Sequence, residues 1–187
     1  YFTMELLHDG CRLSDAARAL PLGERIRLLL QVLQALTYLH RRGVLHRDLK
    51  PANILVVGAG DAANVKLLDF GLAVLRRHQT SLQHEVSGTL GYIAPELLLG
   101  HAADEASDLY ALGVVAYELL VGRVPFAQLH TSELLFAPAS DTLDWGVPDV
   151  PTQFAPFLQR LLARAPGDRY PSADAAARDL LRLSDRG

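Results

Sequence analysis

The chain has 187 residues, of which 50% are apolar and 21% charged, a composition typical of one globular domain with a good-sized core. The formal net charge of −3 and the lack of a long basic run argue against a general attraction to nucleic acid or acidic membranes. A single cysteine, Cys11, excludes internal disulfides and a cysteine-based metal site, and we expect a cytoplasmic location.

The most apolar run of the sequence is too short to cross a membrane. It extends over Leu109–Tyr117 and stops at Glu118, less than half of the roughly 20 residues that a membrane span requires. We therefore expect a buried helix here and no membrane segment in this chain, although a longer parent protein could be anchored through other regions.

The first elements are a strand and two helices. Tyr1–Leu7 has the pattern of a strand already in progress, ended by the turn residues at 8–10, so we expect the chain to come from a longer polypeptide. Ser14 is a candidate cap for a short helix over Ala16–Leu20. Over Glu24–His40, apolar residues recur at three- and four-residue spacing, which predicts a long amphipathic helix.

The middle of the chain predicts a β-hairpin followed by a long loop. Ile54–Val57 and Val65–Leu68 are short apolar segments typical of strands. Their connection contains Gly58 and Gly60, but it lacks the third glycine and the helix of a phosphate-binding loop, so we interpret it as a plain turn. The long segment Asp69–Glu96 has few periodic signals, and such loops in compact domains are usually functional or mobile.

The C-terminal half of the chain is predicted to be helical. A nearly all-apolar stretch from about Asp108 to Leu120 indicates a helix surrounded by protein. Two further helices are expected over Gln153–Ala163 and Ser172–Leu183, while Pro125–Pro151 has only a weak helical signal. The predicted fold class is therefore mainly α, with a small β component (α+β).

Four separated stretches resemble those of one enzyme family. They are His46–Leu55 (HRDLKPANIL), Asp69-Phe70-Gly71, Ala94-Pro95-Glu96 and Ser107–Gly113 (SDLYALG). In this order and at these spacings they resemble the large C-terminal lobe of a serine/threonine protein kinase. The Ala-, Leu- and Arg-rich composition and the short loops are similar to those of the bacterial branch of this family. The alternative for the first stretch, a solvated loop with alternating charges, is disfavoured by the other three.

The resemblance covers essentially the whole chain and implies one partial kinase domain over residues 1–187. The hinge would be residues 1–11, the helical C-lobe 12–187 with the hairpin at the catalytic cleft, and the activation segment 69–96. The N-lobe, with its glycine-rich loop and nucleotide-gripping lysine, is expected to be absent. We therefore expect weak ATP binding, poor phosphate transfer and an exposed apolar patch near the hinge and Phe70.

The resemblance implies transfer of the ATP γ-phosphate to serine or threonine hydroxyls of protein substrates. Asp48 would accept or orient the hydroxyl proton, and Lys50 would neutralise charge on the phosphoryl group. Asn53 and Asp69 would hold Mg²⁺, a hard cation that prefers oxygen ligands. Thr89 would bridge Asp48 and Lys50, a pattern of serine/threonine rather than tyrosine kinases.

The resemblance also implies part of an adenine site. Met4 would guard the back pocket, the main-chain groups of Glu5 and Leu7 would hydrogen-bond the adenine, and Leu55 would form the pocket floor. Cys11 would lie at the ribose edge and be reachable from the ATP pocket. The alternative for Cys11 is a buried and inert thiol.

Three further roles implied by the resemblance are structural. His46 would pack under Phe70, and we disfavour a general-base role for it. Asp108 would accept hydrogen bonds from the backbone of the catalytic loop, and a helix N-cap is a second, compatible interpretation. Glu96 would form a buried ion pair with Arg169 that anchors the activation segment.

Arg47 suggests regulation by phosphorylation. Kinases with an arginine before the catalytic aspartate commonly use it to bind a phosphate on the activation segment. The candidate acceptors are Thr80, Ser81 and Ser87. Glu85, four residues before Thr89, is either a built-in weaker anion or a solvated glutamate.

The alternative function is a non-catalytic pseudokinase or an interaction module. The intact Asp48, Asn53 and Asp69 argue against it, because a scaffold need not keep these side chains. The expected cofactors are ATP and Mg²⁺, and no nucleic-acid partner is expected.

Overall fold

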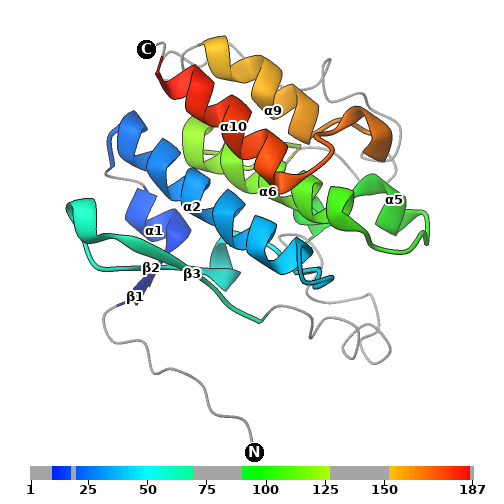
Figure 1. The fold of residues 1–187 in the computed structure, drawn as a ribbon, viewed down its shortest axis with the longest axis horizontal. Coiled ribbons are helices and arrows are strands. Elements are labelled where there is room, and N and C mark those ends of the chain that lie inside the picture. Colours follow the sequence, from blue (N-terminus) through cyan, green and yellow to red (C-terminus); the bar gives the residue numbers. More distant parts are fainter. Residues whose placement is uncertain (1–9, 18–19, 70–89, 127–151, 186–187) are drawn as a thin grey trace, which may run out of the picture.

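The fold of this chain is described by a computed structural model for residues 10–17, 20–69, 90–126 and 152–185. A small sheet lies at one side of a set of helices (Figure 1). The strands are β1 (Gly10–Arg12), β2 (Ile54–Val57) and β3 (Asn64–Leu67), and the helices are α1 (Leu13–Ala17), α2 (Leu22–His40), α5 (Pro95–Leu98), α6 (Glu105–Val121), α9 (Ala155–Leu161) and α10 (Ala173–Ser184). The predicted mainly α fold with a small β component is therefore confirmed.

The sheet has the antiparallel order β1-β2-β3, and the predicted hairpin forms its β2–β3 part. Gly58 opens the turn with φ of +84°, and a Cβ there would lie 2.8 Å from the Ala62 carbonyl oxygen, so the position requires glycine. The prediction that Gly10 lies in a turn is wrong, because Gly10 pairs with Val57 in β1. Beside the hairpin, the Gln31 side chain of α2 accepts the Val65 amide hydrogen at 2.8 Å and donates to the Ala63 carbonyl at 3.0 Å.

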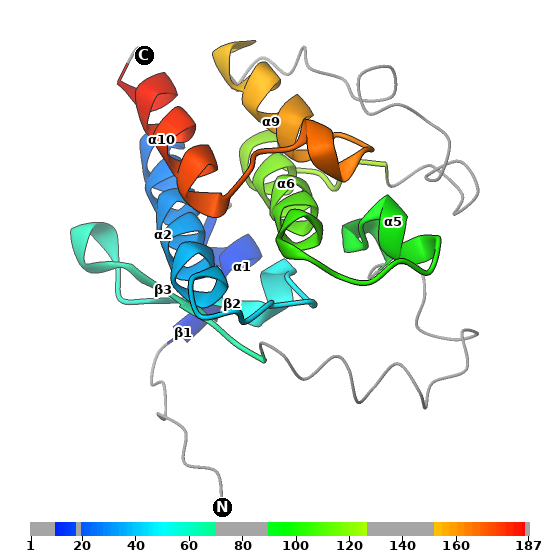
Figure 2. The ribbon, with the colours of Figure 1, turned by 45° about the vertical axis from the view of Figure 1, so that its right-hand side comes forward.

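The long amphipathic helix is confirmed as α2, which begins two residues earlier than predicted and ends at His40. Its buried face includes Leu29, Leu33 and Leu36 and packs against α10 and α6, while β3 covers another side. Figure 2 shows α10 alongside α2 and α9 alongside α6. Ser14 is not a helix cap, because α1 begins at Leu13 and includes it.

The buried helix α6 lies in the centre of the bundle. Each residue from Ser107 to Tyr117 is buried, as the all-apolar pattern predicted. The helix starts earlier than expected, with Asp104 as its N-cap: the Asp104 carboxylate accepts from the Ser107 amide at 3.0 Å. The second interpretation of Asp108 as the cap is therefore wrong, since the cap is supplied one turn earlier.

The last two helices are close to their predicted positions. α9 is shorter than expected because a 3₁₀ turn over Thr152–Phe154 precedes it. α10 begins after Ser172, whose hydroxyl accepts from the Ala175 amide at 3.1 Å as an N-cap. α6 and α9 approach closely at Gly113, where a Cβ would lie 2.8 Å from Leu161 Cβ.

Several predicted features lie outside the described residues. They are the strand over residues 1–7, the apolar patch near the hinge and Phe70, most of the activation segment, and most of the weakly helical region before residue 151. Among the helices that the structure describes, none combines the length and the apolar character needed to cross a bilayer.

Candidate active site

The backbone of the candidate catalytic loop is held by one buried carboxylate. Asp108 accepts the His46 amide hydrogen on Oδ2 and the Arg47 amide hydrogen on Oδ1, each at 2.8 Å. Arg47 has φ of +66°, a left-handed conformation that costs a non-glycine residue about 1–2 kcal/mol. The predicted contact between Asp108 and the loop backbone is therefore present, and it stabilises a conformation that the loop would not adopt alone.

Three polar side chains of the loop form one cluster. Lys50 Nζ lies 3.2 Å from Oδ1 and 3.0 Å from Oδ2 of Asp48. The Asn53 amide donates to Asp48 Oδ2 at 2.9 Å and to the Asp48 carbonyl at 2.7 Å. Because the side chain of Asp48 is 36% exposed and that of Lys50 25%, both can meet a ligand that arrives from solvent.

Asn53 and Asp69 supply oxygen atoms of the kind that Mg²⁺ prefers. The amide nitrogen of Asn53 faces Asp48, which turns its oxygen Oδ1 away from that carboxylate. The Leu68 amide donates to the Asn53 carbonyl at 2.9 Å, and Asp69 is the next residue in the chain. Asp69 is exposed and has φ of +54°.

This donor set fits magnesium better than it fits a metal held by protein alone. The described residues contain no group of three or more His, Cys, Asp or Glu side chains that could hold a metal ion. Mg²⁺ characteristically uses one or two protein oxygens and completes its shell with water and substrate phosphates. One amide and one carboxylate are therefore a sufficient protein contribution.

His46 is completely buried beside these acidic residues. Desolvation lowers its pKa below the ordinary value of 6.5, although the charges of Asp108, Asp48 and Asp69 act in the opposite direction. Neither ring nitrogen has a hydrogen-bond partner within the part of the chain described here. A buried, neutral imidazole supports a packing role rather than a general-base role.

Glu96 and Arg169 form the predicted buried ion pair. Two guanidinium nitrogens donate to Oε1 and Oε2 of Glu96 at 2.8 Å each. Burial alone would raise the pKa of Glu96, but the hydrogen bonds from Arg169 lower it below its ordinary value. The remaining donors of Arg169 bind backbone carbonyls of Ala106, Ala163 and Arg164.

The predicted nucleotide-site residues are only partly described. Cys11 lies in β1 opposite Val56 and is exposed, so the alternative of a buried thiol is wrong. Leu55 lies in β2 and is half-buried. The other predicted site residues fall outside the described ranges, namely Met4, Glu5, Leu7, Phe70, Gly71, Thr80, Ser81, Glu85, Ser87 and Thr89.

Two contacts near the site were not predicted. His40 Nε2 lies 2.9 Å from Asp108 Oδ2, and the Tyr92 hydroxyl donates to Glu118 Oε2 at 2.6 Å. Burial, together with the Glu118 carboxylate, raises the pKa of Tyr92. In the sequence, each contact could have been suspected from a polar residue within an apolar pattern. His40 follows the buried Leu36 by four positions, and Glu118 interrupts the apolar run of α6.

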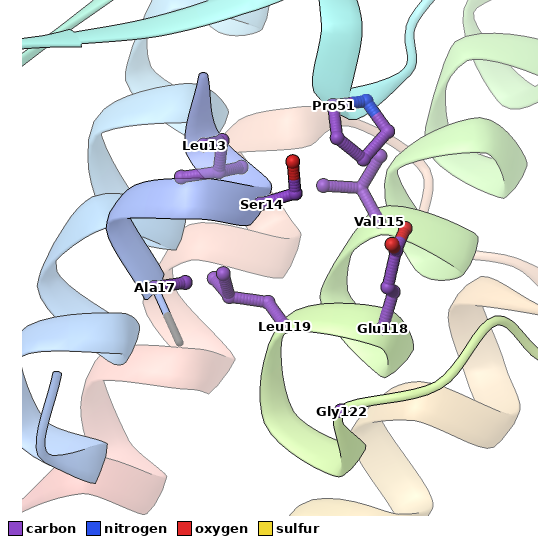
Figure 3. A pocket seen from close by; sticks show the side chains of 8 residues that line it. All are labelled: Leu13, Ser14, Ala17, Pro51, Val115, Glu118, Leu119 and Gly122. Carbon is purple, nitrogen blue, oxygen red and sulfur yellow. The ribbon is translucent and has the colours of Figure 1, made fainter. Parts of the chain in front are cut away.

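A small pocket lies beside the loop, between α1 and α6 with Pro51 at one end (Figure 3). Its volume is about 80 Å³, and its polar groups include Ser14 and Glu118. Sites for small-molecule ligands usually enclose about 300–1,000 Å³, so this pocket suits one side chain rather than a nucleotide.

A loop with clustered Asp, Lys and Asn, held at the foot of a helical bundle by a buried Asp, is an arrangement suited to phosphoryl transfer. Residues 1–181 match the family described as "Protein kinase domain", and the chain belongs to this family.

Curated relatives support the same family. The chain is 42% identical to the serine/threonine-protein kinase Pkn1 of Myxococcus xanthus, over 98% of this chain and 27% of that protein. It is 37% identical to the serine/threonine-protein kinase PknL of Mycobacterium tuberculosis, over 99% of this chain and 47% of the relative. A probable serine/threonine-protein kinase PknB of Corynebacterium glutamicum is 37% identical over 86% of this chain and 26% of its own length. The chain therefore spans between about a quarter and a half of these relatives.

Proposed function

We propose that this chain is the large-lobe part of a serine/threonine protein kinase that transfers the γ-phosphoryl group of ATP to serine or threonine hydroxyls of proteins. The observation that carries the proposal is the Asp48, Lys50 and Asn53 cluster, whose loop is fixed by Asp108. The names of the relatives and the residues Lys50 and Thr89 support the choice of acceptor.

In the proposed reaction, Asp48 orients the acceptor hydroxyl and takes its proton on a carboxylate oxygen. Lys50, 3.0 Å from that carboxylate, reaches the transferring phosphoryl oxygens with the same ammonium group. Asn53 Oδ1 and the Asp69 carboxylate would hold Mg²⁺, which when bound would neutralise charge on the phosphates. The contribution of the protein is thus positioning and charge stabilisation.

The finer assignments follow the same proposal. Residues 1–11 would be the hinge and 69–96 the activation segment, with the N-lobe outside this chain. Arg47 is exposed and would bind a phosphate on Thr80, Ser81 or Ser87, or the carboxylate of Glu85. We place the reaction in the cytoplasm, with protein substrates as partners.

The test is phosphate transfer from labelled ATP to a peptide library by the protein as its gene encodes it. We expect phosphoserine and phosphothreonine as products, and Asp48→Asn should reduce the rate by about 10²-fold or more. The matched control is Asp61→Asn, because the Asp61 side chain is fully exposed on the hairpin turn. Mainly phosphotyrosine would contradict the acceptor assignment.

A non-catalytic pseudokinase or interaction module is the alternative that the same assay separates. It predicts no transfer by the wild-type protein and no difference between Asp48→Asn and Asp61→Asn. Transfer that disappears only in Asp48→Asn would exclude it.

A further inference from the structure

The edge strand β3 is only partly buried. Its residues, Asn64–Leu67, alternate between exposed and half-buried, whereas its hairpin partner β2 contributes the buried side chains of Ile54 and Val56 to the core. In the part of the chain that the structure describes, β2 is the only strand paired with β3. Half of the backbone groups of β3 therefore need partners from outside the sheet.

The outer side of β3 is bound by the side-chain amide of Gln31 on α2. Oε1 of Gln31 accepts the Val65 amide hydrogen at 2.8 Å, and Nε2 donates to the Ala63 carbonyl at 3.0 Å. A backbone amide only donates and a carbonyl only accepts, so these two partners determine how the Gln31 amide is oriented. One side chain thus takes the place that a residue of a parallel strand would have opposite Asn64.

Arg27 lies one helical turn before Gln31 and contacts the same hairpin. Its guanidinium donates to the Asp61 carbonyl at 3.0 Å and to the Gly60 carbonyl. Residues four apart lie on one face of a helix, so α2 presents two polar side chains in a row to the turn and to the start of β3. The turn end of the hairpin is therefore attached to the 19-residue helix α2, beside which β3 lies (Figure 1).

The opposite end of the hairpin carries the two proposed magnesium ligands. Asn53 directly precedes β2, and Asp69 follows Leu68, whose amide donates to the Asn53 carbonyl at 2.9 Å. Ile54 pairs with Leu67 at the same end. The position of β3 relative to β2 therefore determines how Asp69 lies relative to Asn53. Buried side chains are what normally fix the register of a strand, and β3 has none, so contacts from α2 must supply part of that constraint.

We infer that Gln31 is a positioning residue for the magnesium site: its amide fixes β3 on α2, and the hairpin in turn holds the oxygen ligands of Asn53 and Asp69 in place. The inference rests on the proposed function, which assigns Mg²⁺ to these two side chains. Mg²⁺ requires near-ideal octahedral geometry. Loss of the Gln31 contacts should therefore lower the affinity for the ion even where the fold is retained.

The experiment compares variants of the protein as its gene encodes it. Gln31→Met and Gln31→Leu remove both hydrogen bonds and differ in length, so one folded variant is sufficient. Gln31→Glu keeps an acceptor oxygen for the Val65 amide, and Gln34→Met is the matched control, because Gln34 is exposed on the same helix.

For Gln31→Met and Gln31→Leu we expect the Mg²⁺ concentration for half-maximal phosphate transfer to rise about threefold to tenfold, with kcat at saturating Mg²⁺ within about twofold. Gln31→Glu should recover most of the affinity for Mg²⁺, and Gln34→Met should match the wild type. A plain loss of folded protein would instead lower kcat and leave the Mg²⁺ requirement unchanged, and that result would overturn the inference.

A second measurement needs neither ATP nor magnesium. Hydrogen exchange of the Val65 and Leu68 amides should accelerate about tenfold or more in Gln31→Met or Gln31→Leu, relative to the Leu180 amide in α10. In Gln31→Glu, exchange at Val65 should return toward the wild type.

Unchanged Leu68 exchange or an unchanged Mg²⁺ requirement in a folded Gln31→Met or Gln31→Leu variant would contradict the role of Gln31. An equal effect of Gln34→Met, or no recovery in Gln31→Glu, would do the same. If the wild-type protein transferred no phosphate, the proposed function would fail, and exchange at Leu68 would still decide whether Gln31 holds the far end of the hairpin.

Discussion

Arg169 and Glu96 are 73 positions apart in the chain and form two parallel hydrogen bonds of 2.8 Å each. The side chain of Arg169 is completely buried and that of Glu96 is 11% exposed. All five N–H donors of the guanidinium can be accounted for by two carboxylate oxygens and three backbone carbonyls. The pair thus joins α5 to the bundle next to the start of α6.

Removal of either partner should strongly destabilise the protein, because the remaining charge is left buried. We expect Arg169→Met or Glu96→Gln to lower the free energy of unfolding by about 3–5 kcal/mol in urea titrations. The control is Arg178→Met, which breaks an exposed pair with Asp174 and should cost about 1 kcal/mol or less. A loss as small as that of Arg178→Met would contradict a structural role for the buried pair.

Acid should weaken the fold through His46. Its pKa is lowered below 6.5 by burial, so the unfolded chain takes up a proton at a higher pH than the folded protein does. The stability it contributes is therefore fully present above pH 6.5 and is lost as the pH falls through the folded pKa, at up to about 1.4 kcal/mol per pH unit.

The measurement for His46 is the free energy of unfolding between pH 8 and pH 5, compared with that of His46→Leu. We expect the wild type to lose more stability than the variant as the pH falls. Parallel curves would show that His46 does not titrate differently in the folded and unfolded states.

Gly113 and Gly23 should respond in opposite ways to the same substitution. A Cβ on Gly113 would lie 2.8 Å from Leu161 Cβ, an atom next to the backbone of α9, so Gly113→Ala should destabilise the protein by about 1–3 kcal/mol. Gly23 lies in α2 with nothing within 4 Å of its Cβ position, and Gly23→Ala should stabilise it by about 0.5–1 kcal/mol. Thermal unfolding of both variants tests whether α6 and α9 are packed as closely as described.

Replacement of Asn53 should change the magnesium dependence of phosphate transfer. Chelation with EDTA should abolish transfer, and Asn53→Ala should raise the Mg²⁺ concentration for half-maximal activity by about tenfold or more. Asn64→Ala is the matched control, since the Asn64 side chain is exposed at the start of β3 and donates to the nearby Ala62 carbonyl at 2.9 Å. An unchanged Mg²⁺ requirement in Asn53→Ala would remove Asn53 from the metal site.

Local sequence patterns predicted the helices and strands that depend on residues close together in the chain. The spacing of apolar residues identified α2 and α6, and Ser172 marked the start of α10, because helix periodicity and capping depend on neighbours within one or two turns. The hairpin was predicted for the same reason. The strand β1 was missed, since it exists only by pairing with β2, 45 residues away at Cys11 and Val56.

By itself, the sequence determined the chemical groups of the candidate site: the Asp, Lys and Asn of the loop and the charges of Glu96 and Arg169. Only the tertiary structure decided how these groups are held. Asp108 could have been a helix cap, but Asp104 takes that role and Asp108 faces His40 and the loop, 68 and 62 positions away from His40 and His46. The direction of a buried side chain depends on the packing of distant helices, and no spacing along the chain encodes it.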